Sequence, residues 1–190
     1  MGKSHFYSWL FCSFTVALFL FNGCGGGSGS GSGGGGQQFL LQSDSFQNQG
    51  RIPERCSYAG GNASPHLRWS GFPEQTRSFV ITCIDINAEN FVHWVVYDIP
   101  VYDIPVNNID IPEGASGNFL NPIKEGQNDF EETGYGGPAP PANERHQYRF
   151  TVYALSVATL GLPDGASYDQ VISAMQGKVL ARAELTGLYP

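Results

Sequence analysis

Positive charge is scarce in this sequence. Of its 190 residues, 10 are Lys or Arg and 17 are Asp or Glu, so the formal net charge is −7. Proteins that bind nucleic acid carry a basic patch or stripe, and the sequence has none. We therefore expect no nucleic-acid partner. A binding site for an anion would have to be built locally, from a few hydrogen-bond donors.

Motifs for common catalytic and metal sites are also absent. The sequence has no Gly-x-Ser-x-Gly, no His-Glu-x-x-His and no phosphate-binding Gly-x-x-x-x-Gly-Lys. Neither a nucleophile with an evident base nor a set of three or four metal ligands can be recognised. We therefore expect no enzyme activity, no catalytic residue, no cofactor and no metal. A hydrolase with an unrecognised site is the alternative.

Cysteine is sparse, with four in the chain. Cys12 lies in an apolar N-terminal run and Cys24 just after it, which leaves Cys56 and Cys83 for the folded part. In an oxidising compartment these two could form a disulfide. The alternative is that Cys83, within the apolar run FVITCIDI, is a small buried hydrophobic residue.

The N-terminus holds the longest apolar run. Trp9–Phe21 (WLFCSFTVALFLF) is nearly all apolar and follows the positive charge of Lys3. A membrane span needs about 20 apolar residues, so this shorter run fits an export signal better, with an uncleaved anchor as the alternative. Phe21–Cys24 resembles the lipobox of bacterial lipoproteins, whose cysteine is lipidated. We expect residues 1–24 to be a lipoprotein-type signal peptide with Cys24 as the lipidation site.

A flexible tether is predicted for residues 25–38, because positions 25–36 contain only Gly and Ser and cannot bury apolar surface. Behind a lipidated Cys24, such a tether would hold the next domain at a membrane. We therefore expect an exported protein, lipid-anchored in the bacterial cell envelope. Residues 39–190 are long enough for one domain with a hydrophobic core.

That domain is predicted to be mainly β. Ser78–Asn87 and Phe91–Ile99 are apolar and β-branched, as in central strands, and Gln147–Ser156 alternates between apolar and polar residues. A helix is expected only near the end, where Ser167-Tyr168-Asp169-Gln170 fits a capping box. Val179–Leu185 then alternates like a last strand.

Other segments indicate short strands and loops. Phe39–Gly50 suggests a short first strand and His66–Trp69 another. The pentapeptide VYDIP occurs twice, at 96–100 and 101–105, and its prolines make the second copy an edge or loop segment. Pro112–Phe130 is expected to be a long polar loop.

Two polar residues are unusual in the central strands. His93 lies within FVHWVVYDI and Asp85 within FVITCIDI, where both side chains need partners. His93 can be a core histidine paired with a backbone carbonyl, or part of a site. The Gly- and Pro-rich segment Gly134–Tyr148 (GYGGPAPPANERHQY) must be a loop of fixed shape, and it brings His146 and Tyr148 to the start of a strand. We expect these four residues to form a small polar pocket.

Five segments of the chain, in order, are SFVITCIDIN, FVHWVVYDIP, GQNDF, GYGGPAPP and HQYRFTVYAL. Together with IPERCSYAGGNASPHLRW they resemble the phosphatidylethanolamine-binding protein (PEBP) family, in its bacterial Raf-kinase-inhibitor-like branch, from about Phe46 to Tyr189. The resemblance implies a PEBP-like β-sandwich with a large central sheet, a smaller sheet and a C-terminal helix. The sequence departs from the family pattern at Asn87, where a second carboxylate is usual, and at Ala139, where cysteine is usual.

The resemblance also implies a ligand site for a small phosphate-like anion or phospholipid headgroup. By position, the site residues would be Asp85, His93, Tyr135, Pro140, Pro141, His146 and Tyr148. The histidines and the Tyr148 hydroxyl would donate hydrogen bonds while Asp85 orients a histidine, so binding should strengthen as pH falls through the histidine range. The expected function is that of a membrane-tethered binding protein. An inhibitor of a protein kinase or protease, with a protein target, is the alternative.

Overall fold

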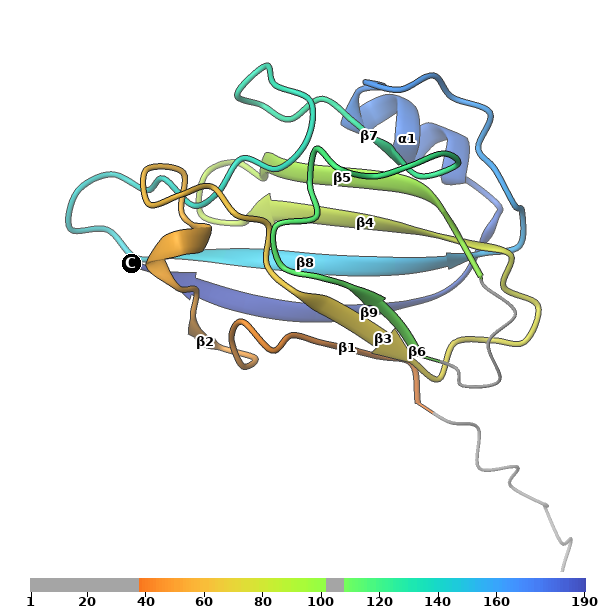
Figure 1. Cartoon of the computed structure of the whole chain (residues 1–190), viewed down its shortest axis with the longest axis horizontal. Coiled ribbons are helices and arrows are strands. Elements are labelled where there is room, and N and C mark those ends of the chain that lie inside the picture. The colour runs from red at the N-terminus through yellow and green to blue at the C-terminus, as the bar shows by residue number, and fades with distance from the viewer. Residues whose placement is uncertain (1–37, 102–107) are drawn as a thin grey trace, which may run out of the picture. The chain divides into compact units, whose positions relative to one another are not determined.

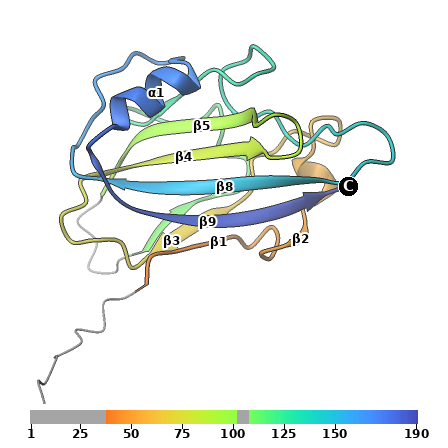
Figure 2. The same ribbon diagram turned by 180° about the vertical axis from the view of Figure 1, so that it is seen from behind.

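The computed structural model describes residues 38–101 and 108–190 (Figures 1 and 2). The predicted signal peptide with Cys24, almost all of the predicted tether and most of the second VYDIP copy lie outside these residues. The strands are β1 (Leu40–Gln42), β2 (Gly50–Arg51), β3 (Leu67–Ser70), β4 (Ser78–Asp85), β5 (Phe91–Pro100), β6 (Asn108–Ile111), β7 (Lys124–Glu125), β8 (His146–Leu155) and β9 (Val179–Tyr189). One 3-10 turn (Glu54–Cys56) and one α-helix, α1 (Tyr168–Met175), complete the described elements.

The strands form two sheets. The larger has six strands in the order β2-β9-β8-β4-β5-β7, and the smaller has three in the order β1-β3-β6. The smaller sheet covers one face of the larger, as Figure 1 shows, and α1 packs on the other face beside β5. The predicted mainly β fold with a large sheet, a small sheet and a late helix is confirmed.

The sequence of strand β4 is mostly apolar, and the burial of the strand explains this. All eight of its residues are buried, because both faces of the strand are covered. Phe79, Ile81 and Cys83 face the smaller sheet, while Val80 and Ile84 face the layer that contains α1. A strand covered on both faces cannot show simple alternation.

Strand β8 alternates because its second face is less completely covered. Tyr148, Phe150 and Val152 are fully buried in the core between the sheets, whereas Gln147 and Arg149 are partly exposed. The alternation predicted for this segment is therefore confirmed.

Helix α1 begins as its sequence predicts. The Ser167 side chain accepts a hydrogen bond from the Gln170 backbone N–H, and the Gln170 side chain accepts one from the Ser167 N–H. This reciprocal capping box satisfies backbone donors that the first helical turn leaves unpaired. Val171 and Met175 are the buried residues of the helix, so its apolar side is fixed against the sheet.

The structure corrects some predicted boundaries. The segment Pro112–Phe130 is not entirely a loop, because β7 adds a short edge strand to β5 within it. The last strand is longer than predicted and runs to Tyr189. Cys56 and Cys83 are buried free thiols, so the disulfide is not formed and the buried-hydrophobe interpretation of Cys83 holds. No helix in the described part of the chain is long and apolar enough to cross a membrane.

The first VYDIP copy lies in β5 and contains a buried carboxylate. Asp98 is 1% exposed and has a positive φ of 57°, at an irregularity in the pairing of β4 with β5. It accepts hydrogen bonds from the Leu160 N–H, the Thr159 hydroxyl and the Lys124 ammonium. Asp98 therefore fastens the loop before α1 to the sheet.

Candidate functional site

The polar residues singled out in the sequence meet at one end of the larger sheet. Asp85 ends β4 and pairs across the ladder with Tyr148 on one side and with Phe91 on the other. His146 begins β8, and His93 lies near the start of β5. Antiparallel pairing thus brings three strand ends together, and with them Asp85, His93, His146 and Tyr148.

Asp85 and His146 form the closest contact of this cluster. The Nδ1 of His146 lies 2.6 Å from Oδ2 of Asp85, and the two residues are 7% and 3% exposed. A carboxylate only accepts, so Nδ1 carries the proton and the ring orientation is fixed. The other Asp85 oxygen accepts from the Asn87 N–H at 2.9 Å. Asp85 therefore orients a histidine, as expected, and that histidine is His146.

A second carboxylate, that of Glu144, contacts the same ring. Its Oε2 lies 3.2 Å from Nε2 of His146. Burial works against a charged His146 ring, but the hydrogen bonds to Asp85 and Glu144 outweigh it and raise the pKa of His146 above its ordinary value. Glu144 was not among the residues predicted from the sequence. Its position two residues before His146 was the available signal, since side chains at that spacing share a face in extended chain.

His93 is held by the glycine-rich loop. Its Nδ1 lies 2.7 Å from the Gly136 carbonyl, and the Gly136 N–H donates to the His93 carbonyl at 2.9 Å. This close approach requires glycine, because a Cβ at position 136 would lie 2.5 Å from the Phe130 ring. Burial lowers the pKa of His93, although the hydrogen bond to Gly136 opposes the shift. The predicted pairing of His93 with a backbone carbonyl is therefore present, and burial favours the neutral form of the ring.

Tyr148 carries the unfilled hydrogen-bonding capacity of the cluster. Its ring packs edge-on against His93 with centroids 5.1 Å apart. Its hydroxyl is buried, and no residue in the described ranges forms a hydrogen bond with it. Burial, followed by the charge of Asp85 and the proximity of its carboxylate to the hydroxyl, raises the pKa of Tyr148 far above its ordinary value, so the group is a neutral donor. The Asp85 carboxylate lies near this hydroxyl without the geometry of a hydrogen bond. A buried unpaired hydroxyl costs roughly 1–3 kcal/mol, which a ligand acceptor would recover.

Aromatic rings that the sequence analysis did not select flank the cluster. The Phe130 ring packs against His93, with centroids 5.4 Å apart, and stacks on Tyr58 at 4.5 Å. Phe91 completes the group, with its centroid 5.2 Å from that of His93. Phe130 belongs to the GQNDF segment that carried the family resemblance, so the signal for it was present. These rings lower the local polarity and strengthen electrostatic interactions within the cluster.

The remaining predicted site residues lie less centrally. The Tyr135 hydroxyl is buried and donates to the Cys56 carbonyl at 2.9 Å, so its donor is engaged in the fold. Pro140 is half-buried and Pro141 exposed, and the Pro141 carbonyl accepts from the Glu144 N–H. The two prolines thus shape the loop that presents Glu144 and His146.

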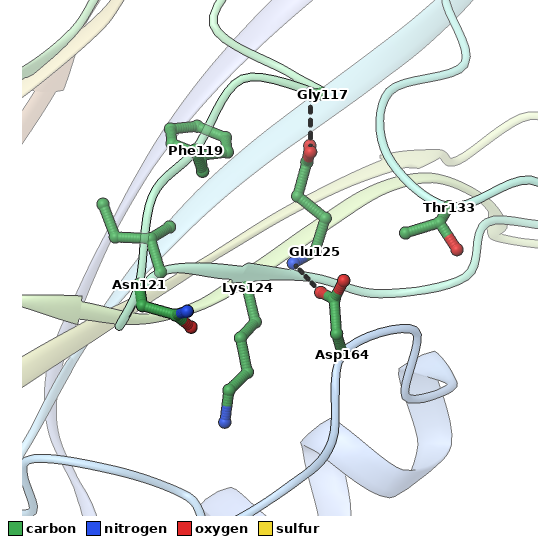
Figure 3. A pocket seen from close by; sticks show the side chains of 8 residues that line it. Gly117, Phe119, Asn121, Lys124, Glu125, Thr133 and Asp164 are labelled. Carbon is green, nitrogen blue, oxygen red and sulfur yellow. Dashed lines mark hydrogen bonds between the residues drawn. The ribbon is translucent and has the colours of Figure 1, made fainter.

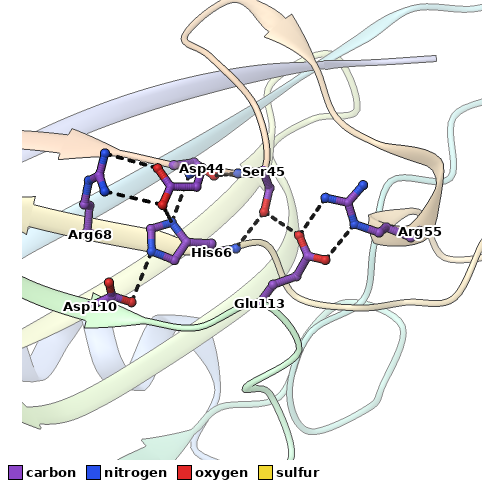
Figure 4. A network of polar contacts seen from close by, with 8 residues as sticks. Asp44, Ser45, Arg55, His66, Arg68, Asp110 and Glu113 are labelled. Carbon is purple, nitrogen blue, oxygen red and sulfur yellow. Dashed lines mark hydrogen bonds and ion pairs between the residues drawn. The ribbon is translucent and has the colours of Figure 1, made fainter.

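The third described histidine belongs to a different network, on the smaller sheet (Figure 4). The Asp44 N–H donates to Nδ1 of His66 at 2.9 Å, and Nε2 lies 3.1 Å from an oxygen of Asp110. Arg68 pairs with Asp44, and the His66 N–H donates to the Ser45 hydroxyl. Both ring nitrogens and the backbone N–H of His66 therefore have protein partners.

A cavity of about 430 Å³ lies near β7 (Figure 3). Its most buried polar group, the Glu125 carboxylate, accepts from Trp94 Nε1, the Ser116 hydroxyl and the Gly117 N–H. The Lys124 ammonium donates to the Leu162 carbonyl at 2.6 Å. Because these groups are already satisfied, the cavity presents a weaker case for a ligand site than the Asp85–His146 cluster.

The cluster contains two groups that can donate hydrogen bonds to an anion. It offers the neutral Tyr148 hydroxyl and a His146 ring whose pKa is raised. The two cysteine thiols in the described residues are poor nucleophiles. Burial raises the pKa of Cys56 to about 11 and that of Cys83 well above its ordinary value. Across the described residues, no group of three or more His, Cys, Asp or Glu side chains could hold a metal ion.

Comparison with family models gives a match over most of the chain. The model described as phosphatidylethanolamine-binding protein matches residues 42–190. This range contains both sheets except the start of β1, the helix, and every member of the Asp85–His146 cluster.

Similar proteins are found in bacteria and archaea. A UPF0098 protein of Aquifex aeolicus is 45% identical over 150 residues, which cover 77% of this chain and 85% of that protein. The UPF0098 protein YbhB of Escherichia coli is 36% identical over 160 residues, covering 78% of this chain and 97% of YbhB. The crystal structure of Escherichia coli YbcL, described as a new member of the mammalian PEBP family, superposes with a TM-score of 0.71 at 30% identity and covers 80% of this chain and 97% of YbcL.

Proposed function

The chain belongs to the phosphatidylethanolamine-binding protein family, and from that premise we propose that it binds a phosphate-type anion at Asp85, His93, His146 and Tyr148. The anion is either free phosphate or the phosphate of a phospholipid headgroup. The observation that carries the proposal is the buried Tyr148 hydroxyl, which has no protein partner in the described chain and lies in the same cluster as His146.

The donors match a tetrahedral oxyanion. The Tyr148 hydroxyl supplies one hydrogen bond, and the Nε2 of a protonated His146 supplies a charge-assisted one. Asp85 keeps Nδ1 of His146 occupied, so the ring can present only its other nitrogen to a ligand. His93 supports the Tyr148 ring and, being neutral, adds little positive charge.

We assign binding rather than catalysis to this cluster. The described cysteine thiols are buried with raised pKa values, and no step of covalent chemistry is needed to explain the groups present. Location completes the proposal: lipidation at Cys24 and the tether at residues 25–38 would hold the domain, within residues 39–190, at a membrane of the bacterial envelope.

Calorimetric titration with inorganic phosphate tests the proposal. Tyr148→Phe should weaken phosphate binding about three- to tenfold, since one hydrogen bond to the anion is lost. Tyr153→Phe is the matched control, because Tyr153 lies on the opposite face of β8 and should leave affinity unchanged. Equal affinity in all three proteins would place the anion elsewhere.

A second arm separates the two sources of phosphate. Vesicles of phosphatidylcholine with and without phosphatidylethanolamine are sedimented with the domain. If the headgroup is the ligand, phosphatidylethanolamine increases the bound fraction and Tyr148→Phe reverses the increase. If free phosphate is the ligand, the vesicles bind equally and calorimetry alone shows the effect.

A protein target is the second candidate. Leu120 is 82% exposed and lines, together with Ile109 and Ile123, a groove of about 640 Å³. An exposed groove that joins several apolar side chains is a feature of protein interaction surfaces. A pull-down from envelope extract should then retain a protein that Leu120→Ser loses. Identical recovery with both proteins would remove this candidate.

A further inference from the structure

We infer that Glu144 is an internal competitor for the anion site. Its carboxylate occupies the position beside Nε2 of His146 that an external anion needs, so a ligand binds only by displacing it. This inference rests on the proposed anion site. It adds that Glu144 lowers the affinity of that site for its ligand. It starts from the 3.2 Å contact between Glu144 and His146.

The Glu144 carboxylate resembles the proposed ligand chemically. A carboxylate and a phosphate oxygen both accept hydrogen bonds from imidazole nitrogens. Because Asp85 already occupies Nδ1 at 2.6 Å, Nε2 is the nitrogen of His146 that remains for a ligand, and Glu144 holds it. An anion and the Glu144 carboxylate cannot share one donor, and their charges repel each other.

Burial explains why Glu144 is the member that moves. The side chains of Asp85 and His146 are 4% and 9% exposed, whereas that of Glu144 is 60% exposed. The Tyr148 hydroxyl is out of contact with solvent, so an anion that reaches it must first displace a group at the surface of the cluster. Glu144 is the exposed residue in contact with the ring, and an exposed carboxylate loses little on returning to water.

The loop holds Glu144 in place without neutralising it. Its backbone N–H donates to the Pro141 carbonyl at 3.1 Å, which closes a turn before β8. The adjacent cation, Arg145, points elsewhere, since its Nε donates to the Pro190 carbonyl at 3.2 Å. The Glu144 carboxylate therefore interacts with His146 and not with the adjacent Arg145.

Calorimetric titration of inorganic phosphate into the full chain tests this. Glu144→Gln removes the competing charge and should tighten phosphate binding about three- to tenfold, the range expected for an exposed ion pair plus the relieved repulsion. Glu74→Gln is the control, because Glu74 is exposed and lies just before β4, at the other end of that strand from Asp85. It makes the same change in net charge and should leave the affinity as in wild type.

The outcomes distinguish the two proposals. Tighter binding by Glu144→Gln alone supports the inference, and so does binding that is detectable only in Glu144→Gln. If wild type binds phosphate and Glu144→Gln binds equally or more weakly, Glu144 has at most a structural role and the inference is overturned. If none of the three proteins binds phosphate, the proposed phosphate site itself is wrong, and the inference fails with it.

A spectroscopic readout follows Glu144 directly. Its side-chain carboxyl carbon signal is assigned by its disappearance in Glu144→Gln. Phosphate should shift that signal toward the position of a solvated carboxylate, because the contact with His146 breaks. A Glu144 signal that does not move while phosphate binds would overturn displacement.

Discussion

Two histidines in this protein each contact a pair of acidic residues, yet their settings differ. His146 lies between Asp85 and Glu144 at the end of the larger sheet, and His66 lies between Asp44 and Asp110 on the smaller sheet. The amino-acid sequence alone does not show that the two histidines have different surroundings. The neighbouring groups, and not the histidine itself, distinguish the proposed binding cluster around His146 from the network around His66.

Around His66, the polar groups satisfy one another. Its Nδ1 accepts a backbone N–H, which fixes the proton on Nε2, and Arg68 balances the charge of Asp44 (Figure 4). Nearby, Arg55 pairs with Glu113 through two hydrogen bonds of 2.6 and 3.0 Å. In this network the charged groups and hydrogen-bond donors pair with one another, so no ligand is needed to complete it.

Around His146, one donor and one charge are left over. The Tyr148 hydroxyl is buried without a partner in the described chain, and the carboxylates of Asp85 and Glu144 share one ring. Hydrogen bonding is therefore incomplete at the buried Tyr148 hydroxyl, and the two carboxylates exceed the single positive charge of a protonated His146 ring. Incomplete buried networks are costly and are retained at functional sites.

The largest expected difference between the clusters is in stability. Asp85→Ala should lower the free energy of unfolding by roughly 3 kcal/mol, because it leaves the buried His146 ring without its main partner. Asp110→Ala should lower it by less than about 1 kcal/mol, since that side chain is 55% exposed. Urea unfolding of the two variants makes the comparison. Equal losses would contradict the distinction drawn from burial.

Ligand binding should separate the histidines next. His146→Asn keeps an amide donor near the Nδ1 position but loses Nε2 and the positive charge, so phosphate affinity should fall about tenfold or more. His66→Asn keeps an acceptor near Nδ1 and should leave phosphate affinity as in wild type. Calorimetry on both variants provides the measurement. A comparable fall in His66→Asn would mean that the smaller sheet also contributes to binding.

A stability gain is expected from Tyr148→Phe, the substitution that should weaken binding. Removing an unpaired buried hydroxyl should raise the free energy of unfolding by about 1 kcal/mol in the absence of ligand. Opposite effects on stability and binding are typical of a residue retained for a ligand. A loss of stability in urea unfolding without phosphate would show that the hydroxyl has a structural partner after all.

The smallest expected effect is on the pH dependence of stability. The pKa of His146 is raised in the folded protein, so its contribution is fully present below the unfolded value of about 6.5 and is lost as pH rises through the folded value. The pKa of His93 is lowered, so His93 instead costs stability as pH falls below about 6.5. The difference in unfolding free energy between wild type and His146→Asn should therefore shrink as pH rises above about 6.5. A difference that grows over this range would have the wrong sign for a raised pKa.

The pH dependence of phosphate binding should also be determined by His146. The expected strengthening of binding at lower pH depends on His146, because burial favours the neutral form of His93. From the sequence, both the His93 and the His146 rings were predicted to be donors. With Nδ1 of a neutral His93 engaged by Gly136, the ring supports its neighbours more than it attracts an anion.

Much of the fold was predictable because local patterns and tertiary burial agree. The apolar run at β4, the alternation of β8 and the capping box of α1 each correspond to an observed element. The short strand β7 was not predictable, since its two residues, Lys124 and Glu125, have no local strand pattern. It forms because β5 offers an open edge with which they pair.

The candidate site was predictable as a set of residues and not as a network. Asp85 and His93 stood out because each interrupts an apolar strand. Which histidine Asp85 contacts could not be read from spacing, since His146 is 61 residues away in the chain. The sequence equally gave no sign that the Tyr135 hydroxyl is taken by the Cys56 carbonyl, 79 residues distant.

By itself, the sequence determined the mainly β class, the late helix, and the buried polar residues that require partners, because periodicity, capping and polarity act over a few residues. Tertiary structure alone decided the partners. Ladder register placed Asp85 opposite Tyr148, loop closure brought Glu144 to His146, and the smaller sheet surrounded His66 with charges of both signs. Hydrogen bonding depends on distance in space, and pairing of distant strands sets that distance only when the whole sheet has formed.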